Sequence, residues 1–481
     1  MFVAVAACTD HSAGDLYPTP IAIADQVSID EDARTLALSL LVTNDITSSC
    51  RAHAEVVTSP QHGLVTTDSS PTYVPDPGFH GPDAFTYRVV DCGGISDPAT
   101  VTVDVRSNGI PYEQAIALDP TPVTAMATGD INGDGKADVV ILEEASSTVV
   151  ILVNRTTTPG AYAVEPVRFE GGHAPVGLAV ADLDGDGRLD LVTAAGTDGL
   201  VILRNLTPAG GTLAFAAPLL IPAGSAVGVV AADLDGDGRP DLASIDEAGN
   251  RLDVRLNISM PGTIAFGART SFVTPPGPRS LEAVDADGTG GMDLAVLAVS
   301  PWPNQDSGAG TFALFANATA LGDAVPSFAA RVDRATGQYP TALFVADLDG
   351  DHRPEIGVVD DGLWIYANQS APGAAPSYLA ARVLDLAGKV LVAAPIDLDG
   401  NGSLDLVLGT TGQDPVTTLV NQSAPASGFA FAAHQSVIGD GKHARVSTGQ
   451  PSTLRLVELD GVPPAEVVLG TSHGSLLLHG D

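Results

Sequence analysis

The chain has 481 residues, of which 44% are hydrophobic, so it can bury a large core or several smaller ones. Its 58 acidic residues outnumber the 22 basic ones, and the formal net charge of −36 excludes nucleic acid and anionic lipid surfaces as favourable partners. Short runs of Val, Ala, Leu and Ile alternate with 52 glycines and 35 prolines, which predicts an all-β fold of many short strands.

Residues 1–17 are predicted to be a signal remnant or a lipoprotein tether. The segment MFVAVAAC is apolar, but it lacks a basic start and is short for a signal peptide. Its end, VAAC, resembles a bacterial lipobox, which makes Cys8 the candidate for lipidation; the alternative is an apolar tip without a lipid. No other segment approaches the ~18 apolar residues that span a bilayer. We expect a secreted or cell-surface protein; if Cys8 is lipidated, we expect an outer-membrane lipoprotein.

Residues 18–106 are predicted to form a small β-sandwich, because apolar and polar residues alternate between Gly and Pro turns. The segment resembles bacterial cadherin-like or Ig-like modules. The residues that carry this resemblance, expected in turns and core, are Tyr73, Pro75, Gly78, Phe79, Gly81, Asp83, Phe85, Tyr87, Asp91 and Val103. Asp30, Glu31 and Asp32 are interpreted as a solvated turn, with metal ligands as the alternative. The stretch SNGIP, 107–111, is the predicted boundary.

Two of the three cysteines, Cys50 and Cys92, lie in this module. They are the candidate disulfide pair, since an oxidising compartment favours such a bond in a small domain. The sequence does not give the distance between them, so the alternative of two free thiols stays open.

One acidic motif recurs seven times between residues 110 and 481. The copies are 50 to 62 residues apart and begin at Asp130, Asp182, Asp233, Asp285, Asp347, Asp397 and Glu458. Each copy has a short apolar strand before the loop and another after it, and a third strand in the first six copies ends at an Asn: Asn154, Asn205, Asn257, Asn317, Asn368 and Asn421. With a fourth strand, about 50 residues make one blade of a β-propeller.

The count predicts a seven-bladed β-propeller over residues 110–481, preceded by the β-sandwich. The seventh copy stops where its third strand ends, so it lacks a fourth. The unmatched stretch YEQAIALD, 112–119, precedes the first loop and is predicted to supply that strand. Such a pairing closes the ring and removes an exposed sheet edge.

The loop ADLDGDGRLDLVT, 181–193, has oxygen-bearing side chains at positions 1, 3, 5 and 9. Gly187 is at position 6, where a sharp turn requires a positive φ. The spacing matches the first part of an EF-hand, but position 12 is Thr193 and the flanks are strands, which excludes an EF-hand. Oxygens that converge in a tight turn suit Ca²⁺ better than Mg²⁺, which requires a stricter octahedron. The alternative is a plain Asp/Gly turn.

The first six copies supply the candidate metal ligands. Position 7 offers a backbone oxygen, and its basic side chains partly offset the acidic charge. In chain order the candidates are Asp130, Asn132, Asp134, Lys136 and Asp138; Asp182, Asp184, Asp186, Arg188 and Asp190; Asp233, Asp235, Asp237, Arg239 and Asp241; Asp285, Asp287, Thr289 and Asp293; Asp347, Asp349, Asp351, Arg353 and Glu355; and Asp397, Asp399, Asn401, Ser403 and Asp405.

These loops resemble those of FG-GAP/VCBS repeat proteins, the propeller type of integrin α heads, over about three-quarters of the chain. The resemblance implies a calcium-stabilised propeller for extracellular binding, with about four to six calcium ions, one per intact loop. The copies are unequal. Copy four has Thr289 at position 5, and copy five has His352 at position 6. Copy seven has Val462 and Pro464 in place of ligands, so no metal is expected in copy seven.

No catalytic motif is present: the ten histidines show no metal-ligand spacing, and no nucleophile elbow or phosphate loop occurs. The Asn residues stand in N-x-S/T sequons, which we interpret as a repeated turn with a capping hydroxyl rather than as glycosylation sites. We expect a non-enzymatic monomer that binds an extracellular protein or glycan, with an insertion around Trp302 as a contact surface. A secreted carbohydrate-active enzyme or lectin is the alternative.

Overall fold

The chain divides into two compact units, Met1–Ile110 and Pro111–Asp481. Among the described residues no helix is long and apolar enough to cross a membrane. The computed structural model describes residues 18–30, 36–37, 43–47, 52–66, 72–75, 81–106, 114–119, 121–158, 162–299, 309–360, 362–379, 382–384, 389–397, 402–411, 416–421, 423, 429, 431–435, 451–457, 459, 466–471 and 474–479.

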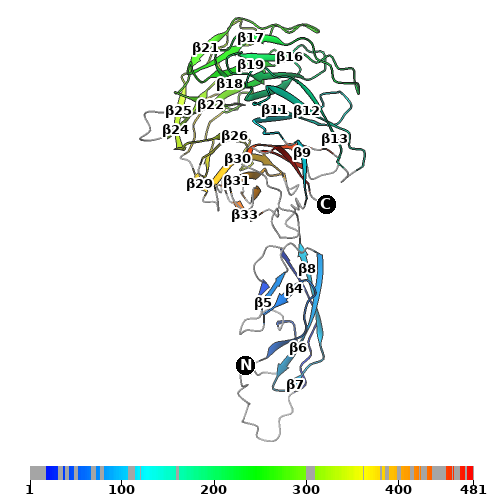
Figure 1. Ribbon diagram of the computed structural model, residues 1–481. Helices are drawn as coiled ribbons and strands as arrows, with labels where there is room; N and C mark the ends of the chain where they lie inside the picture. The colour runs from blue at the N-terminus through cyan, green and yellow to red at the C-terminus, as the bar shows by residue number, and fades with distance from the viewer. Residues whose placement is uncertain are drawn as a thin grey trace. The chain divides into compact units, whose positions relative to one another are not determined.

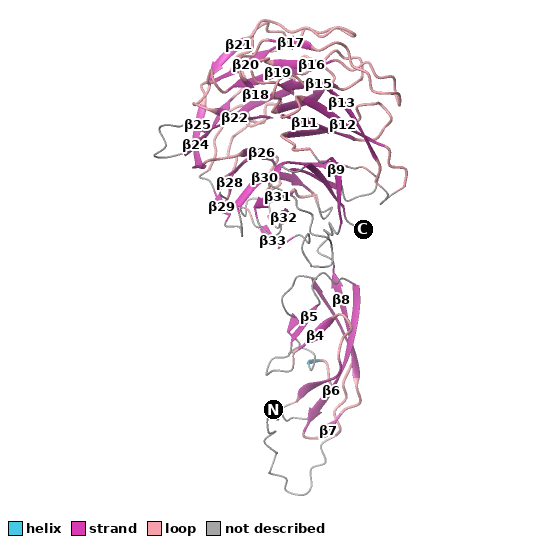
Figure 2. Ribbon diagram, in the orientation of Figure 1, coloured by secondary structure: helices cyan, strands magenta, loops and turns pink. Residues whose placement is uncertain are grey.

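Several of the predictions concern residues outside this range. They are Cys8 with the rest of 1–17, Cys50, Glu31, Asp32, Gly78, Phe79, Asp399, Asn401, Trp302 with its insertion, and most of the seventh acidic loop, including Val462 and Pro464. Within the described residues the fold is all-β, as predicted, apart from a short 3₁₀ turn at Thr43 (Figure 2).

The first unit contains two sheets. One has the order β1-β8-β6-β3 with β7 beside β6, and β1 runs parallel to β8; the other has the order β2-β5-β4. The strands are β1 (Asp25–Asp30), β2 (Leu36–Ala37), β3 (His53–Thr58), β4 (Gly63–Val65), β5 (Thr72–Pro75), β6 (Gly81–Asp91), β7 (Gly94–Ile95) and β8 (Ala99–Arg106).

The core of this unit lies between its two sheets. Tyr73 of β5 stacks on Phe85 of β6 with ring centroids 6.4 Å apart, and Tyr87 and Val103 are fully buried beside them. Alternate residues of β6 and β8 face this core, as a strand with one buried face requires. The predicted core roles of these four residues are therefore confirmed.

Asp83 explains why the module's signature needs a carboxylate at a buried position. Burial disfavours its charge, but hydrogen bonds from the backbone of Gln61, Ala84 and His62 and from the Tyr73 hydroxyl outweigh that effect and lower its pKa. Cys92 is disulfide-bonded. Its predicted partner, Cys50, lies outside the described residues, so that pairing stays a prediction.

The second unit contains seven four-stranded sheets, called sheets 1 to 7 in chain order, each antiparallel throughout (Figure 1). Sheets 1 to 3 consist of β10 (Ala125–Gly129), β11 (Asp138–Glu143), β12 (Thr148–Asn154) and β13 (Val164–Glu170); β14 (Gly177–Ala181), β15 (Asp190–Ala194), β16 (Leu200–Leu203) and β17 (Leu219–Ile221); and β18 (Ala226–Ala232), β19 (Asp241–Asp246), β20 (Arg251–Arg255) and β21 (Thr270–Val273).

Sheets 4 to 6 follow the same plan. They consist of β22 (Pro278–Val284), β23 (Asp293–Val299), β24 (Ala309–Phe315) and β25 (Val332–Gln338); β26 (Ala342–Ala346), β27 (Glu355–Val359), β28 (Leu363–Tyr366) and β29 (Arg382–Leu384); and β30 (Lys389–Ile396), β31 (Asp405–Thr411), β32 (Val416–Asn421) and β33 (Phe431–Gln435).

Sheet 7 joins the two ends of the repeat array. It has the order β34-β35-β36-β9, with β34 (Pro451–Val457), β35 (Glu466–Thr471), β36 (Gly474–His479) and β9 (Gln114–Asp119). Strand β9 lies beside the last strands of the chain in Figure 1, and its pairing with β36 is antiparallel. The prediction that 112–119 supplies the missing fourth strand is confirmed.

The cores of this unit lie between neighbouring sheets. Strands β11 and β19 are buried along their whole length, because a neighbouring sheet covers each face. One cluster packs Leu459 and Val468 of sheet 7 against Met126, Val139 and Ile141 of sheet 1. The first strands of the sheets contact one another in succession, β10, β14, β18, β22, β26, β30 and β34, and β34 contacts β10 again.

Candidate metal-binding loops

Each acidic loop joins the first strand of a sheet to its second, and in the six loops where position 1 is described its carboxylate closes the turn. In sheet 2, Asp182 Oδ1 accepts the N–H of Gly185 at 2.8 Å, and Asp182 Oδ2 accepts that of Gly187 at 2.8 Å. Asp233 makes the same two bonds in sheet 3, to Gly236 and Gly238, both at 2.8 Å. Backbone N–H groups thus stabilise the position 1 charge, a common role of Asp in turns.

Position 6 has a left-handed backbone in every loop where it is described. Five copies have glycine there, with φ between +84° and +88°: Gly135, Gly187, Gly238, Gly290 and Gly402. The remaining described loop, that of sheet 5, has His352 at φ +66°, a conformation that costs a side-chain-bearing residue ~1–2 kcal/mol. The sequence correctly indicated a turn that requires a positive φ.

Position 9 ties the loop to two strands. The Asp190 carboxylate accepts the N–H of Leu183 at 3.0 Å and that of Asn205 at 2.7 Å, and the side chain is almost completely buried. Asp138, Asp241 and Asp293 make the equivalent pair of bonds. Burial, only partly offset by these bonds, raises the pKa of Asp190 to about 6. A neighbouring cation would restore the charged form.

Among the residues that the structure describes, three carboxylates of one loop come together in four sheets. In sheets 2, 3 and 4 these are positions 1, 3 and 9, with one oxygen of each within 4.8 Å of the others: Asp182, Asp184 and Asp190; Asp233, Asp235 and Asp241; and Asp285, Asp287 and Asp293. In sheet 5 the group is positions 1, 3 and 5, Asp347, Asp349 and Asp351, without Glu355. Loop 4 therefore matches loops 2 and 3 although Thr289 occupies its position 5.

Position 5 has a different role in sheets 2 and 3. The Asp186 carboxylate pairs with the Arg188 guanidinium and accepts the Arg188 N–H at 3.0 Å; Asp237 and Arg239 repeat the arrangement. Arg188 Nε also donates to the carbonyl of Asn205 at 3.0 Å. The basic residue at position 7 offsets one acidic charge of the loop, as the sequence suggested, and anchors the loop to the third strand.

Loop 2 offers the clearest test of whether the residues present fit a cation. Asp184 Oδ1 is buried and has no hydrogen-bond donor. Its other oxygen is held by Arg204 Nη1 and by the N–H of Gly262 in sheet 3, both at 3.1 Å. A buried carboxylate oxygen without a donor, on a side chain that groups with two further carboxylates, fits a cation, and an all-oxygen donor set suits a hard one.

Loops 1 and 6 differ from this pattern within the described residues. In loop 1, the Asn132 amide donates to Asp134 Oδ2 at 3.1 Å, so position 3 here binds within the loop. Lys136 reaches the carbonyl of Thr156. In loop 6, Asp397 accepts the N–H of Gly402 at 2.9 Å and Asp405 accepts that of Asn421 at 2.7 Å. These bonds follow the plan of loop 2, but Asp399 and Asn401 are not described.

Five of the six sequon asparagines are buried and Asn317 is part-buried, and their hydrogen bonds confirm the interpretation as a turn with a capping hydroxyl. Asn205 Oδ1 accepts the N–H of Thr207 at 2.9 Å, and Thr207 Oγ1 accepts the N–H of Ala214 at 3.0 Å. The side-chain amide makes a contact that the sequence did not reveal. Asn205 Nδ2 donates at 2.8 Å to the carbonyl of Ile131, position 2 of the acidic loop in sheet 1.

The same bond links every described sequon to the preceding sheet. The pairs are Asn154 with Leu459, Asn205 with Ile131, Asn257 with Leu183, Asn317 with Leu234, Asn368 with Ala286, and Asn421 with Leu348, at 2.6 to 2.9 Å. Asn154 binds sheet 7, so this series also connects the first sheet to the last. Position 2 thus bonds to two sheets at once, through its N–H to position 9 and through its carbonyl to the next sheet.

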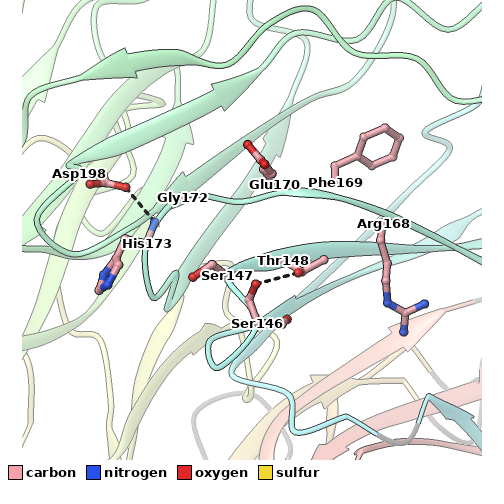
Figure 3. A pocket seen from close by; sticks show the side chains of 9 residues that line it. All are labelled: Ser146, Ser147, Thr148, Arg168, Phe169, Glu170, Gly172, His173 and Asp198. Atoms are coloured by element: carbon pink, nitrogen blue, oxygen red, sulfur yellow. Dashed lines mark hydrogen bonds between the residues drawn. The ribbon is translucent and has the colours of Figure 1, made fainter.

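A cavity of about 550 Å³ lies at the other end of the strands, between sheets 1 and 2. Its polar lining includes Ser146 and Thr148 of the β11–β12 turn, with Arg168 at one end and His173 and Asp198 at the other (Figure 3). The His173 N–H donates to Asp198 Oδ2 at 2.8 Å. The sequence did not single out this cavity, because its lining comes from turns that share no motif.

Comparisons with known proteins follow the same division of the chain. Residues 18–104 match the bacterial Ig domain family. Segments 130–193, 192–244 and 233–296 match FG-GAP-like repeats. The chain carries a bacterial Ig domain followed by FG-GAP-like repeats. Both module types are typically non-catalytic, and their combination is typical of adhesion-type modules.

Other comparisons add little to the FG-GAP assignment. No curated protein matches the chain. One similar solved structure is the crystal structure of BBS1N in complex with ARL6DN, soaked with mercury. It has 14% sequence identity over 75% of this chain and 93% of that chain, with a TM-score of 0.48.

Proposed function

We propose that this FG-GAP repeat chain is a secreted or surface-anchored adhesion protein that binds an extracellular protein or glycan, and that structural calcium holds its repeats. One observation carries the calcium part of the proposal. Three loops gather the carboxylates of positions 1, 3 and 9, and in one of them Asp184 Oδ1 is buried without a donor.

The proposal treats the seven sheets as blades of a closed propeller. The contact between β34 and β10, the pairing of β9 with β36, and the bond from Asn154 to Leu459 all join the two ends of the array and support closure. A closed array has no free sheet edge at its ends, which favours a rigid scaffold for ligand binding.

Calcium is the favoured ion because the donors are carboxylate and backbone oxygens in a flexible turn. Without a cation, three carboxylates within 4.8 Å repel one another and raise the free energy of the folded loop. An affinity on the order of 10⁻⁴–10⁻³ M, as in other extracellular modules, suits the millimolar calcium outside cells.

Thermal unfolding of the full chain tests the structural role. We expect the melting temperature to fall when EGTA replaces calcium and to return when calcium is added in excess. Magnesium is the matched control, and we expect it to restore the melting temperature only in part because it prefers octahedral sites. An unchanged melting temperature in EGTA would refute structural calcium.

The cavity of Figure 3 is our choice for the ligand surface, since hydroxyl and charged groups line it and polar ligands require such groups. A glycan array with and without calcium, together with binding to extracellular matrix proteins, tests this. Thr148→Val and His173→Gln are each expected to weaken the binding of any ligand that these experiments find. Reproducible hydrolysis of a glycan would instead favour an enzyme.

A further inference from the structure

A second cavity, of about 370 Å³, lies among the first strands of sheets 4, 5, 6 and 7. It is lined from the middle of β22, β26, β30 and β34, so it lies inside the ring of contacts that the first strands form. Apolar residues contribute to the lining, Leu343, Phe344, Pro395 and Leu454 among them, and polar groups form at least as much of its surface. Its volume is at the lower end of the range for small-molecule sites, roughly 300–1,000 Å³.

Two charged side chains line this cavity, Glu282 from β22 and Arg455 from β34. No hydrogen bond or ion pair joins Glu282 to any residue that the structure describes. Arg455 makes one hydrogen bond, from Nη1 to the carbonyl of Leu454 at 2.8 Å. The carboxylate and the guanidinium therefore attract each other from a distance without touching.

The surrounding protein shifts the pKa of both charged groups. Burial raises the pKa of Glu282 to about 7, although attraction to Arg455 opposes the rise. Burial also lowers the pKa of Arg455. Arg455 is nevertheless exposed and Glu282 is part-buried, so both groups are accessible from the cavity. Two opposite charges that line one cavity without pairing are typical of a ligand site.

We propose that this cavity binds a small zwitterion, an amino acid or dipeptide, whose ammonium group pairs with Glu282 and whose carboxylate pairs with Arg455. A ligand with one charge would leave the other protein charge unpaired, which costs free energy. A simple anion would also be repelled by the net charge of −36, whereas a zwitterion is neutral overall. This site is independent of calcium and of the cavity in Figure 3.

Isothermal titration of the full chain with the dipeptide Ala-Leu in calcium-containing buffer tests the proposal. We expect saturable 1:1 binding. N-acetyl-Ala-Leu lacks the ammonium group and Ala-Leu-amide lacks the carboxylate, and each is expected to bind at least tenfold more weakly, since each loses one ion pair. Absence of saturable binding, or equal binding of the three probes, overturns the proposal.

Variants locate the site. Glu282→Gln and Arg455→Gln are each expected to weaken Ala-Leu binding at least tenfold. The matched controls are Glu247→Gln and Arg279→Gln, which break an exposed ion pair of 2.9 Å outside the cavity and should leave binding unchanged. Circular dichroism checks that each variant is folded. Should a cavity variant fail to fold, the three-probe comparison on the unaltered chain still decides, and binding that survives both cavity variants refutes the assignment.

Discussion

The acidic loops of sheets 2 and 5 share one backbone plan but differ at two positions. Position 6 is Gly187 in sheet 2 and His352 in sheet 5, and both have a positive φ, +84° and +66°. Position 9 is Asp190 in sheet 2 and Glu355 in sheet 5, and both side chains are buried. The turn and the buried carboxylate are therefore conditions of the fold that two different residues satisfy.

The longer side chain of Glu355 at position 9 still accepts backbone hydrogen bonds, but it does not join the group of carboxylates in its loop. Glu355 still accepts the N–H of Leu348 at 2.8 Å and, less closely, that of Asn368 at 3.3 Å. It does not join the group of carboxylates in its loop, whereas Asp190 does. Closing the loop and gathering ligands are therefore separable, and only the shorter side chain does both.

Removing the position 9 carboxylate is expected to give the largest effect. Asp190→Ala leaves the buried N–H groups of Leu183 and Asn205 without acceptors, which costs about 2–4 kcal/mol of unfolding free energy. Urea unfolding of the full chain, followed by circular dichroism, measures it. Asp186→Ala is the control in the same loop and should cost less than 1 kcal/mol, because the Asp186–Arg188 pair is partly exposed. Equal losses would contradict the role of position 9.

The asparagine hydrogen bond between neighbouring sheets is expected to contribute equally to the stability of sheet 2 and of sheet 5. Asn205→Ala and Asn368→Ala each remove a bond to the preceding sheet, of 2.8 and 2.9 Å, and should each cost about 2 kcal/mol. Urea unfolding of the two variants side by side measures the costs. A clear difference between the two would show that the loops, and not the sheet-to-sheet bonds, set the stability of each region.

Exchanging the position 9 residues tests the ligand group directly. Glu355→Asp should bring a carboxylate into the group of loop 5 and tighten cation binding there roughly tenfold, about 1.4 kcal/mol, while Asp190→Glu should weaken loop 2 by a similar factor. Terbium luminescence titrated against calcium reports the affinities. If both exchanges leave the titration curve unchanged, position 9 is not a ligand.

Position 6 is expected to give the smallest effect. His352→Gly should stabilise loop 5 by about 1 kcal/mol, because glycine adopts φ +66° without a steric penalty. Gly187→Ala should destabilise loop 2 by a similar amount. Melting temperatures in calcium measure both changes, and His352→Ala, which keeps a Cβ, is the control that should bring no gain.

The sequence determined the parts of this protein that repeat. Seven spaced copies predicted seven units of four strands, and the missing strand of the last copy identified 112–119 as its partner. Glycine at position 6 predicted a left-handed turn, and the N-x-S/T pattern indicated a capped turn. Each of these signals is local, since a turn or a strand is specified by residues within a few positions of one another.

Only the tertiary structure decided the contacts between repeats. The carbonyl that Asn205 binds belongs to Ile131, in another sheet, and no pattern in the sequence connects them. Which carboxylates of a loop come together also differs between similar copies, since sheets 2 and 3 gather positions 1, 3 and 9 whereas sheet 5 gathers positions 1, 3 and 5. Glu282 and Arg455 come from different sheets and line one cavity only because the first strands of these sheets pack side by side. Local periodicity in the sequence determines the four-stranded repeat, whereas the packing of one repeat on the next determines which side chains come together.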